Sequence, residues 1–351
     1  MVSRALFLVA LVVSLGGCEP EFSDRSSAVA STRILAVRSD PAESLPNKPA
    51  SYTALLVDSN GTRADGAIDW AYCTEPRPLA ELNDASSQCF VLKADYLIPL
   101  GSGLAVSGTV PQNACRQFGP DVPEAKPGEP PGRPADPDAT GGYSQPLRLI
   151  LPEGNGFVLG LGETRLTCGL AGATSENVTK FKSRYRQNQN PELTEVAALH
   201  PDPVPLLADG EEGATPFEIG HGEALVLRAS WPACPAEPKC GDGICGQTED
   251  PMGCPDDCKE PHGCPGAEPY VYYDPASRTV KDRREGMRVS WFGTAGSFEN
   301  DRTGVGEDDP PGTSTDNTWT APDAAGQVHV WAVLRDTRGG VAWKAYTFAV
   351  H

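Results

Sequence analysis

The chain has 351 residues, of which 37 are Gly and 34 are Pro, and its formal net charge is −18. Proline removes a backbone donor and breaks helix interiors, so this composition argues against long helices, and the length is typical of two domains. The acidic excess argues against DNA or RNA as a partner, because binding to phosphates needs patches of Lys and Arg.

The first residues have the pattern of an export signal. Arg4 supplies a positive charge, and the apolar run of residues 5–13 is too short to span the roughly 30 Å of a bilayer core. The segment Leu15-Gly16-Gly17-Cys18 resembles the lipobox of bacterial lipoproteins, in which the cysteine is lipidated and the leader is cut off just before it. This resemblance implies a signal peptide over residues 1–17 and an acylated Cys18. An ordinary signal peptide with an unrelated cysteine is the alternative.

Acyl chains on Cys18 would hold the protein on a membrane without a transmembrane segment, because each buried CH₂ contributes about 0.8 kcal/mol. Glu19 stands where some lipoproteins of enteric bacteria carry an aspartate that retains them in the inner membrane. We therefore expect a lipid-anchored protein of the outer membrane. Residues 18–31 would then be the lipidated cysteine and a polar tether.

The remaining cysteines favour disulfides. Of the 11 cysteines, ten remain when Cys18 is set aside, and an even number is expected in an oxidising compartment. Four lie in the N-terminal half and six lie close together in the C-terminal half, so each group could pair internally. The candidates are Cys73, Cys89, Cys115, Cys168, Cys234, Cys240, Cys245, Cys254, Cys258 and Cys264.

The first domain is expected over residues 32–200. Its strand-like runs include RILAVR, ASYTALLVD, AIDWAYC and QPLRLILP, and residues 118–142 form a long connection rich in Pro and Gly. One helix is expected over residues 175–186, where Val178, Phe181 and Tyr185 share a face. Its remaining Lys and Arg residues could meet anionic lipid headgroups, although a solvated helix face is the simpler interpretation.

The second domain is expected over residues 206–351, after a linker at HPDPVP, residues 200–205. Apolar residues alternate in GEALVLRASW, GMRVSW, QVHVWAVLRD and VAWKAYTFAV, as in strands with one buried face. Trp70, Trp231 and Trp291 fall on such apolar faces and are expected in the core. Short alternating strands separated by turn signals favour antiparallel sandwiches.

Three C-terminal segments, WFGTAGSFEN, TWTAPDAAG and VHVWAVLRDTRGG, resemble the immunoglobulin-like and PKD-like domains of bacterial surface proteins. The run that begins RILAVRSDPAESLPNKP is similar to the opening strands of the same class. As a whole, the chain is similar to uncharacterised envelope lipoproteins of myxobacteria and their relatives. The resemblance implies an all-β fold with two immunoglobulin-like antiparallel β-sandwich domains and an envelope location, and it implies no activity.

A cysteine-rich insertion, residues 232–267, interrupts the second domain. Its core, CGDGICGQTEDPMGCPDDC, resembles modules of the form CGDGxC followed by CPxDC, which are generally disulfide-bonded and in some cases hold calcium. Cys234 and Cys264 flank the insertion and could close its base, which would leave four cysteines for two bridges inside. Structural zinc is disfavoured by the spacing and by the compartment. Calcium is an open alternative, with the ligands Asp242, Glu249, Asp256 and Asp257.

The sequence favours binding over catalysis. It contains no H-E-x-x-H pair, no G-x-S-x-G elbow and no phosphate-binding loop. Trp331 shares a strand face with His329 and Arg335 and could stack on a sugar or a partner side chain, with core packing as the alternative. We expect no enzyme and no cofactor other than calcium. The expected function is that of a non-enzymatic binding or scaffolding module in cell-surface adhesion or envelope assembly, with a protein or glycan partner at the cell surface. The alternative is an accessory lipoprotein of a secreted hydrolase or transport system that binds glycan or calcium.

Overall fold

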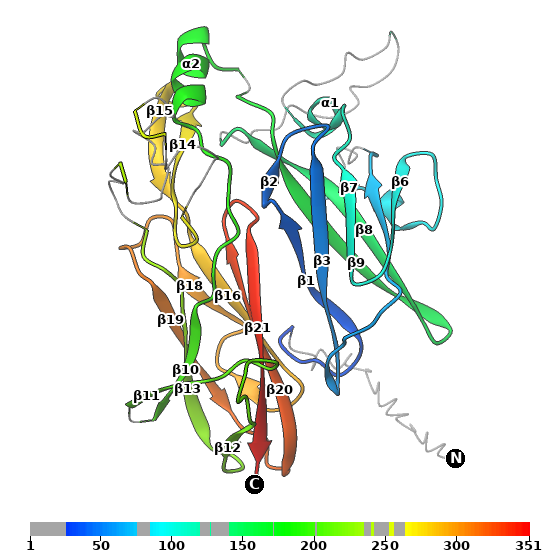
Figure 1. Ribbon diagram of the computed structural model, residues 1–351, viewed down its shortest axis with the longest axis vertical. Coiled ribbons are helices and arrows are strands. Elements are labelled where there is room, and N and C mark those ends of the chain that lie inside the picture. Colours follow the sequence, from blue (N-terminus) through cyan, green and yellow to red (C-terminus); the bar gives the residue numbers. More distant parts are fainter. Residues whose placement is uncertain are drawn as a thin grey trace, which may run out of the picture.

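The structure is a computed structural model, and it describes residues 26–75, 85–119, 127, 140–170, 172–200, 202–234, 240–241, 253–255 and 264–351. These residues form two immunoglobulin-like antiparallel β-sandwiches that lie side by side (Figure 1). The predicted all-β class is confirmed. In the described ranges, no helix is long and apolar enough to cross a membrane.

The first sandwich contains two sheets. One has the order β1-β3-β4, with β7 also paired to β3, and the other has the order β2-β9-β8-β5-β6. The strands of the first sheet are β1 (Arg33–Asp40), β3 (Pro49–Asp58), β4 (Gly61–Thr62) and β7 (Ala105–Thr109). Those of the second are β2 (Glu43–Ser44), β5 (Asp69–Cys73), β6 (Leu97–Ser102), β8 (Gly142–Glu153) and β9 (Gly156–Thr167). Two short helical turns, η1 (Ser87–Phe90) and α1 (Ala114–Phe118), lie in its loops.

Alternation along the strands builds the first core. Tyr52 and Leu56 of β3 point inward together with Trp70 of β5 and Leu149 of β8, and each is at most 1% exposed. The hydroxyls of Tyr52 and Tyr72 satisfy each other at 2.7 Å inside this core. Buried polar groups need such partners, because an unpaired one costs about 1–3 kcal/mol.

The second sandwich also has two sheets, with the orders β11-β10-β13-β19-β17 and β12-β21-β20-β16-β18. The first contains β10 (Glu195–His200), β11 (Asp202–Pro205), β13 (Ala224–Ser230), β17 (Ser297–Phe298) and β19 (Ser314–Thr320). The second contains β12 (Phe217–Ile219), β16 (Met287–Gly293), β18 (Arg302–Val305), β20 (Gly326–Asp336) and β21 (Val341–Val350). Trp231, Trp291 and Trp319 fill the core between them. The core positions predicted for Trp70, Trp231 and Trp291 are thus confirmed.

The boundary between the sandwiches lies earlier than the sequence suggested. The expected first domain, 32–200, includes β10, but β10 pairs with β13 of the second sandwich, with Val196 opposite Ala229. The expected linker at residues 200–205 contributes β11, which folds back on β10 as a hairpin. Its prolines can lie there because β11 is an edge strand, where a missing N–H costs no ladder bond.

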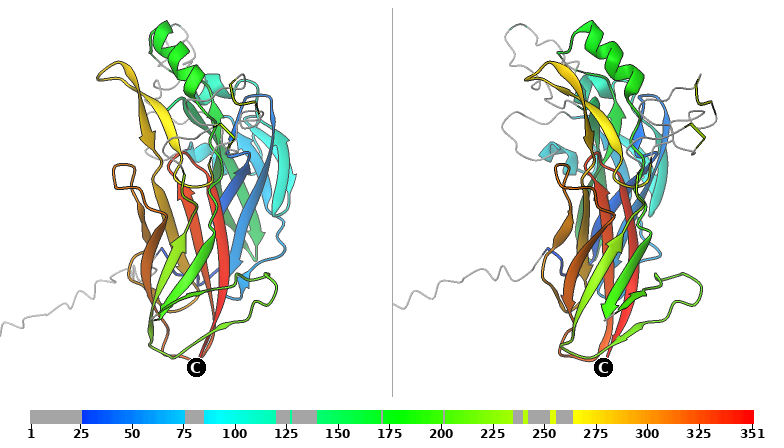
Figure 2. Two further views of the ribbon diagram at one scale, coloured as in Figure 1. Left: turned by 60° about the vertical axis from the view of Figure 1, so that its left-hand side comes forward. Right: turned by 90° about the vertical axis from the view of Figure 1, so that its left-hand side faces the viewer.

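A small apical unit stands at one end of the molecule, and consists of α2 (Ser175–Arg184) and the hairpin β14 (Pro269–Asp274) and β15 (Thr279–Arg284) (Figures 1 and 2). Phe181 of α2 packs on Val271 and Val280 of the hairpin. The helix ends at Arg184, two residues before the expected end, because Tyr185 turns to an extended conformation. The helix that precedes the domain boundary therefore packs on a hairpin that follows the cysteine-rich insertion.

The segment of residues 26–29 is docked on the second sandwich, although it falls in the expected tether. The N–H of Val29 donates to the carbonyl of Gly293 at 2.9 Å, and the N–H of Gly293 donates to the carbonyl of Ser27 at 2.9 Å. Val29 is fully buried. This docked segment lies at the lower end of the first sandwich in Figure 1, away from the apical unit.

Candidate functional site at the junction of the sandwiches

Several predicted site residues fall outside the described residues. These are the lipidation candidate Cys18, the calcium candidates Asp242, Glu249, Asp256 and Asp257, and the disulfide candidates Cys245 and Cys258. Their predicted roles stay predictions.

Four disulfides join the other eight candidate cysteines. They are Cys73–Cys89, Cys115–Cys168, Cys234–Cys264 and Cys240–Cys254. All four join cysteines of the same half of the chain, and Cys234–Cys264 closes the base of the insertion as expected. Cys240–Cys254 is a bridge inside that insertion.

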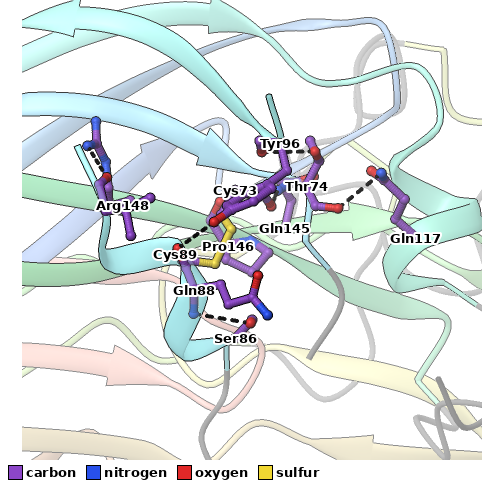
Figure 3. Close-up of a disulfide and its surroundings, with 11 residues drawn as sticks. Cys73, Thr74, Ser86, Gln88, Cys89, Tyr96, Gln117, Gln145, Pro146 and Arg148 are labelled. Carbon is purple, nitrogen blue, oxygen red and sulfur yellow. Dashed lines mark hydrogen bonds between the residues drawn. A yellow bond between two sulfur atoms is a disulfide. The ribbon is translucent and has the colours of Figure 1, made fainter. Parts of the chain in front are cut away.

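The Cys73–Cys89 bridge fastens η1 to the sheet at β5 (Figure 3). The side-chain amide of Gln145 donates to the carbonyl of Cys73 at 2.6 Å, and Arg148 donates to the carbonyl of Val91 at 2.9 Å. Both side chains are buried, and these bonds fix the loop after η1 and the end of β5 to β8. The bridge therefore has a structural use.

Trp331 is buried, and the prediction that it could stack on a ligand at the surface is wrong. Its side chain is 0% exposed and packs in an apolar cluster that joins the two sandwiches. From the first sandwich this cluster contains Leu35 and Val57, and from the second it contains Val333. The indole N–H donates to the hydroxyl of Thr62 at 2.8 Å. Its strand face looked solvent-facing within one domain, but the other sandwich covers it.

A second contact between the sandwiches is polar. We call it the junction cluster and define it as seven buried residues: Glu43, Arg165, Asn188, Glu268, Glu285, Asp336 and Arg338. They come from β2, β9, the segment after α2, the flanks of the β14–β15 hairpin, and the β20–β21 turn. The first sandwich, the second sandwich and the apical hairpin therefore each contribute polar groups to the junction cluster.

Arg338 is the centre of the cluster on the side of the apical unit. Its guanidinium donates to Glu285 at 2.7 Å, to Glu268 at 2.5 Å and to the carbonyl of Arg186 at 3.0 Å. The guanidinium also lies over the ring of Tyr270, 5.0 Å from its centroid. Because the Arg338 side chain is 1% exposed, these partners replace its hydration.

Glu43 is the centre of the cluster on the side of the first sandwich. It accepts from Arg165 at 3.2 Å, from the hydroxyl of Thr167 at 2.8 Å and from the hydroxyl of Tyr185. It also accepts from the backbone N–H of Asn188 at 2.9 Å. The carboxylate thus fixes the chain that leads from α2 into the second sandwich.

Asp336 connects the two centres. Its carboxylate accepts from the side-chain amide of Asn188 at 3.2 Å, and from the N–H groups of Arg338 and Gly340, both at 2.8 Å. A side chain at position 340 would collide with this carboxylate, since a Cβ there would lie 2.1 Å from Asp336 Oδ2. Glycine is therefore required for the turn to close around its own aspartate.

The junction cluster holds four carboxylates and two guanidiniums. Burial raises the pKa of Glu268 to about 7, against the pull of Arg338, and raises the pKa values of Glu285 and Asp336 as well. An excess of buried negative charge is costly, so these carboxyl groups retain protons to a higher pH than in water. The charge of the cluster therefore depends on pH.

The arrangement is suited to holding parts together. Its carboxyl and guanidinium groups bind one another, and all of them are 9% exposed or less. Across the described ranges, no group of three or more His, Cys, Asp or Glu side chains is placed to hold a metal ion. Sequence reasoning missed the junction cluster, because its members are spread from position 43 to position 338. The Asp-Thr-Arg-Gly-Gly turn of residues 336–340 is the one local signal.

No family model and no curated protein matches the chain. Solved structures with some likeness include fibronectin(III)-like modules of CbhA from Clostridium thermocellum (9% identity, TM-score 0.21, 90% of this chain and 94% of that chain covered). The adhesin InvE of Yersinia pseudotuberculosis is another (10%, 0.19, 89% and 58%). A family 2 glycosyl hydrolase from Bacteroides cellulosilyticus is a third (9%, 0.19, 87% and 23%), so the chain spans less than a quarter of that enzyme. At these TM-scores the likenesses carry no functional conclusion.

Proposed function

We propose that this protein is a lipid-anchored component of the outer membrane and acts as a non-enzymatic binding or scaffolding module. The observation that carries the proposal is the separation of two features along the long axis of the molecule. The segment that follows the expected anchor is docked at the lower end of the first sandwich, and the apical unit with the base of the cysteine-rich insertion stands above the second sandwich, at the top of the molecule (Figure 1). An anchored chain of this shape would hold its apical unit away from the lipid.

Two contacts support this role. The apolar cluster around Trp331 and the junction cluster both tie the first sandwich to the second, and the junction cluster also includes Glu268 and Glu285 at the foot of the apical hairpin. These contacts would hold the apical unit at a fixed place relative to the segment that follows the expected anchor. Loops at the end of a sandwich carry recognition in many proteins, because their sequence is free of core constraints.

Site-specific photocrosslinking tests where a partner binds. A crosslinking amino acid is placed at Lys180 on the exposed side of α2, and in a matched variant at Val204, which is 45% exposed on β11 at the opposite end. We expect a discrete adduct with an envelope protein or glycan from position 180 and none from position 204. Equal adducts from both positions, or none from position 180, would contradict the proposal. An adduct with a secreted hydrolase or transporter would assign the accessory role instead.

A further inference from the structure

We infer that a groove beside the docked N-terminal segment binds an oxyanion, namely a phosphate or sulfate group. The groove has a volume of about 530 Å³ and lies on the outer face of the sheet formed by β18, β16 and β20. Four arginines line it: Arg33, Arg288, Arg302 and Arg335. This inference goes beyond the proposed function, because it concerns a different surface from the apical unit.

The strand register brings three of these arginines onto one face. Arg288 of β16 lies directly opposite Arg335 of β20, and Arg302 of β18 lies opposite Ser290, two residues along β16. Residues i and i+2 of a strand share a face, so the three side chains point the same way. Like charges directly opposite one another destabilise a sheet unless a counter-charge compensates them.

Within the described residues, none of the four arginines forms an ion pair with a carboxylate. Arg335 donates to the carbonyl of Leu35 at 2.8 Å and to the hydroxyl of Ser290 at 3.4 Å, and both acceptors are neutral. Arg33 donates to the carbonyls of Ser26 and Ala28 and lies 5.8 Å from the ring centroid of Phe292. Burial, and then the charge of Arg302, lower the pKa of Arg335. Positive charge is therefore concentrated here, and none of these guanidiniums is paired directly with a described carboxylate.

Two carboxylates also line the groove, and both are engaged. Asp301 accepts from the hydroxyl of Ser26 at 2.8 Å. Asp336 belongs to the junction cluster, where Asn188 and the N–H groups of the turn bind it. The four guanidiniums thus exceed the carboxylates on a chain whose net charge is −18.

Guanidinium groups match tetrahedral oxyanions well. Each presents N–H donors in a fixed planar fork, and several guanidiniums can share the oxygens of one phosphate or sulfate. The groove is also open at exposed Arg288 and Arg302, so a group attached to a larger molecule can enter. A phosphate could come from a lipid headgroup, which the anchored segment would bring near, or from a soluble phosphorylated saccharide.

Titration with pyrophosphate and with vesicles tests the inference. The chain without its leader and without Cys18, from residue 19 onward, is titrated with inorganic pyrophosphate at low ionic strength by calorimetry. Its binding to phosphatidylglycerol vesicles is compared with its binding to phosphatidylcholine vesicles by co-sedimentation. The test variant is Arg288→Gln with Arg302→Gln. The matched control is Lys180→Gln with Lys182→Gln, which removes the same charge from the exposed α2. Thermal unfolding of each variant confirms that it is folded.

The expected result is saturable binding that weakens about tenfold or more, or about 1.4 kcal/mol, in the Arg288/Arg302 variant and stays unchanged in the control, since the variant removes charged hydrogen bonds to the oxyanion. Binding to pyrophosphate supports a soluble ligand, and binding to anionic vesicles alone supports a lipid headgroup. Equal weakening in both variants would overturn the inference, because it would show attraction by general charge. The inference would also be overturned if the protein bound neither pyrophosphate nor anionic vesicles.

Discussion

Replacing Arg338 with methionine isolates the contribution of the junction cluster to stability. Methionine fills much of the same space but removes the guanidinium that binds Glu285, Glu268 and the carbonyl of Arg186. The two carboxyl groups would then stay buried without their cation. Breaking a buried ion pair in this way costs about 3–5 kcal/mol, because the remaining charge is uncompensated. We expect the free energy of unfolding to fall by that amount near pH 8.

The pH dependence has a definite sign. Arg338 lowers the pKa values of Glu268 and Glu285, so they rise further without it. In the unfolded chain both groups titrate near 4.3. Between that pH and the raised folded values, the folded state binds more protons than the unfolded state, and stability falls as pH rises. The cost of Arg338→Met is therefore largest at pH 8 and smallest at pH 5, where the carboxyl groups are protonated.

Urea unfolding followed by tryptophan fluorescence at pH 5 and pH 8 measures both effects. The matched control is Arg228→Met, since Arg228 pairs with Asp316 at the exposed surface and both side chains are about two-fifths exposed. Surface pairs contribute little to stability, so the control should change it only slightly at either pH. If Arg338→Met cost no more than the control, or cost the same at both pH values, the account of the junction cluster would be refuted.

Three further predictions concern packing and disulfides. Trp331→Ala should lower the free energy of unfolding by about 3–5 kcal/mol in urea titrations, because it leaves a cavity between the sandwiches; a loss below 1 kcal/mol would contradict its buried position. Phe181→Ala should raise amide exchange in α2 and the β14–β15 hairpin, while exchange in β20 and β21 stays unchanged, because the cluster around Phe181 joins α2 to the hairpin and contains no residue of β20 or β21; an equal rise of exchange in all of these elements would argue against a separate apical unit. Removing Cys115–Cys168, whose cysteines are 53 positions apart, should lower the melting temperature more than removing Cys73–Cys89, whose cysteines are 16 positions apart, since the loop-entropy contributions are about 4 and 3 kcal/mol; the reverse order would contradict this prediction.

Local pattern was sufficient to predict most of the longer strands and the core positions of Trp70, Trp231 and Trp291. Alternation in segments such as ALVLRAS of β13 depends only on neighbours in the sequence, and the structure buries the same face. It was also sufficient for Cys234 and Cys264, because they flank an insertion between two strands. The position of β10 was misjudged because prolines after His200 resembled a linker, whereas the edge strand β11 tolerates them.

Contacts between distant segments could not be predicted. Trp331 lies on the outer face of its own sheet, and only the packing of the first sandwich buries it. The basic groove is another example, since its arginines stand at positions 33, 288, 302 and 335, and none belongs to a charge run. The Lys and Arg residues of α2 could be recognised as a basic group in the sequence, because residues that are close on a helix are also close in the sequence. The pairing of β16 with β18 and β20, which brings these arginines together, could not be predicted from the sequence alone.

The mass of the mature N-terminus tests the central proposal most directly. The full chain with its own leader is expressed in a Gram-negative bacterium, the membrane fraction is digested, and the N-terminal peptide is measured by mass spectrometry. The proposal predicts a peptide that begins at Cys18 and carries acyl chains, and it predicts that Cys18→Ala abolishes both the acylation and the release of the leader. An unmodified N-terminus at any other residue, with the protein in the periplasmic fraction, would contradict the lipid anchor.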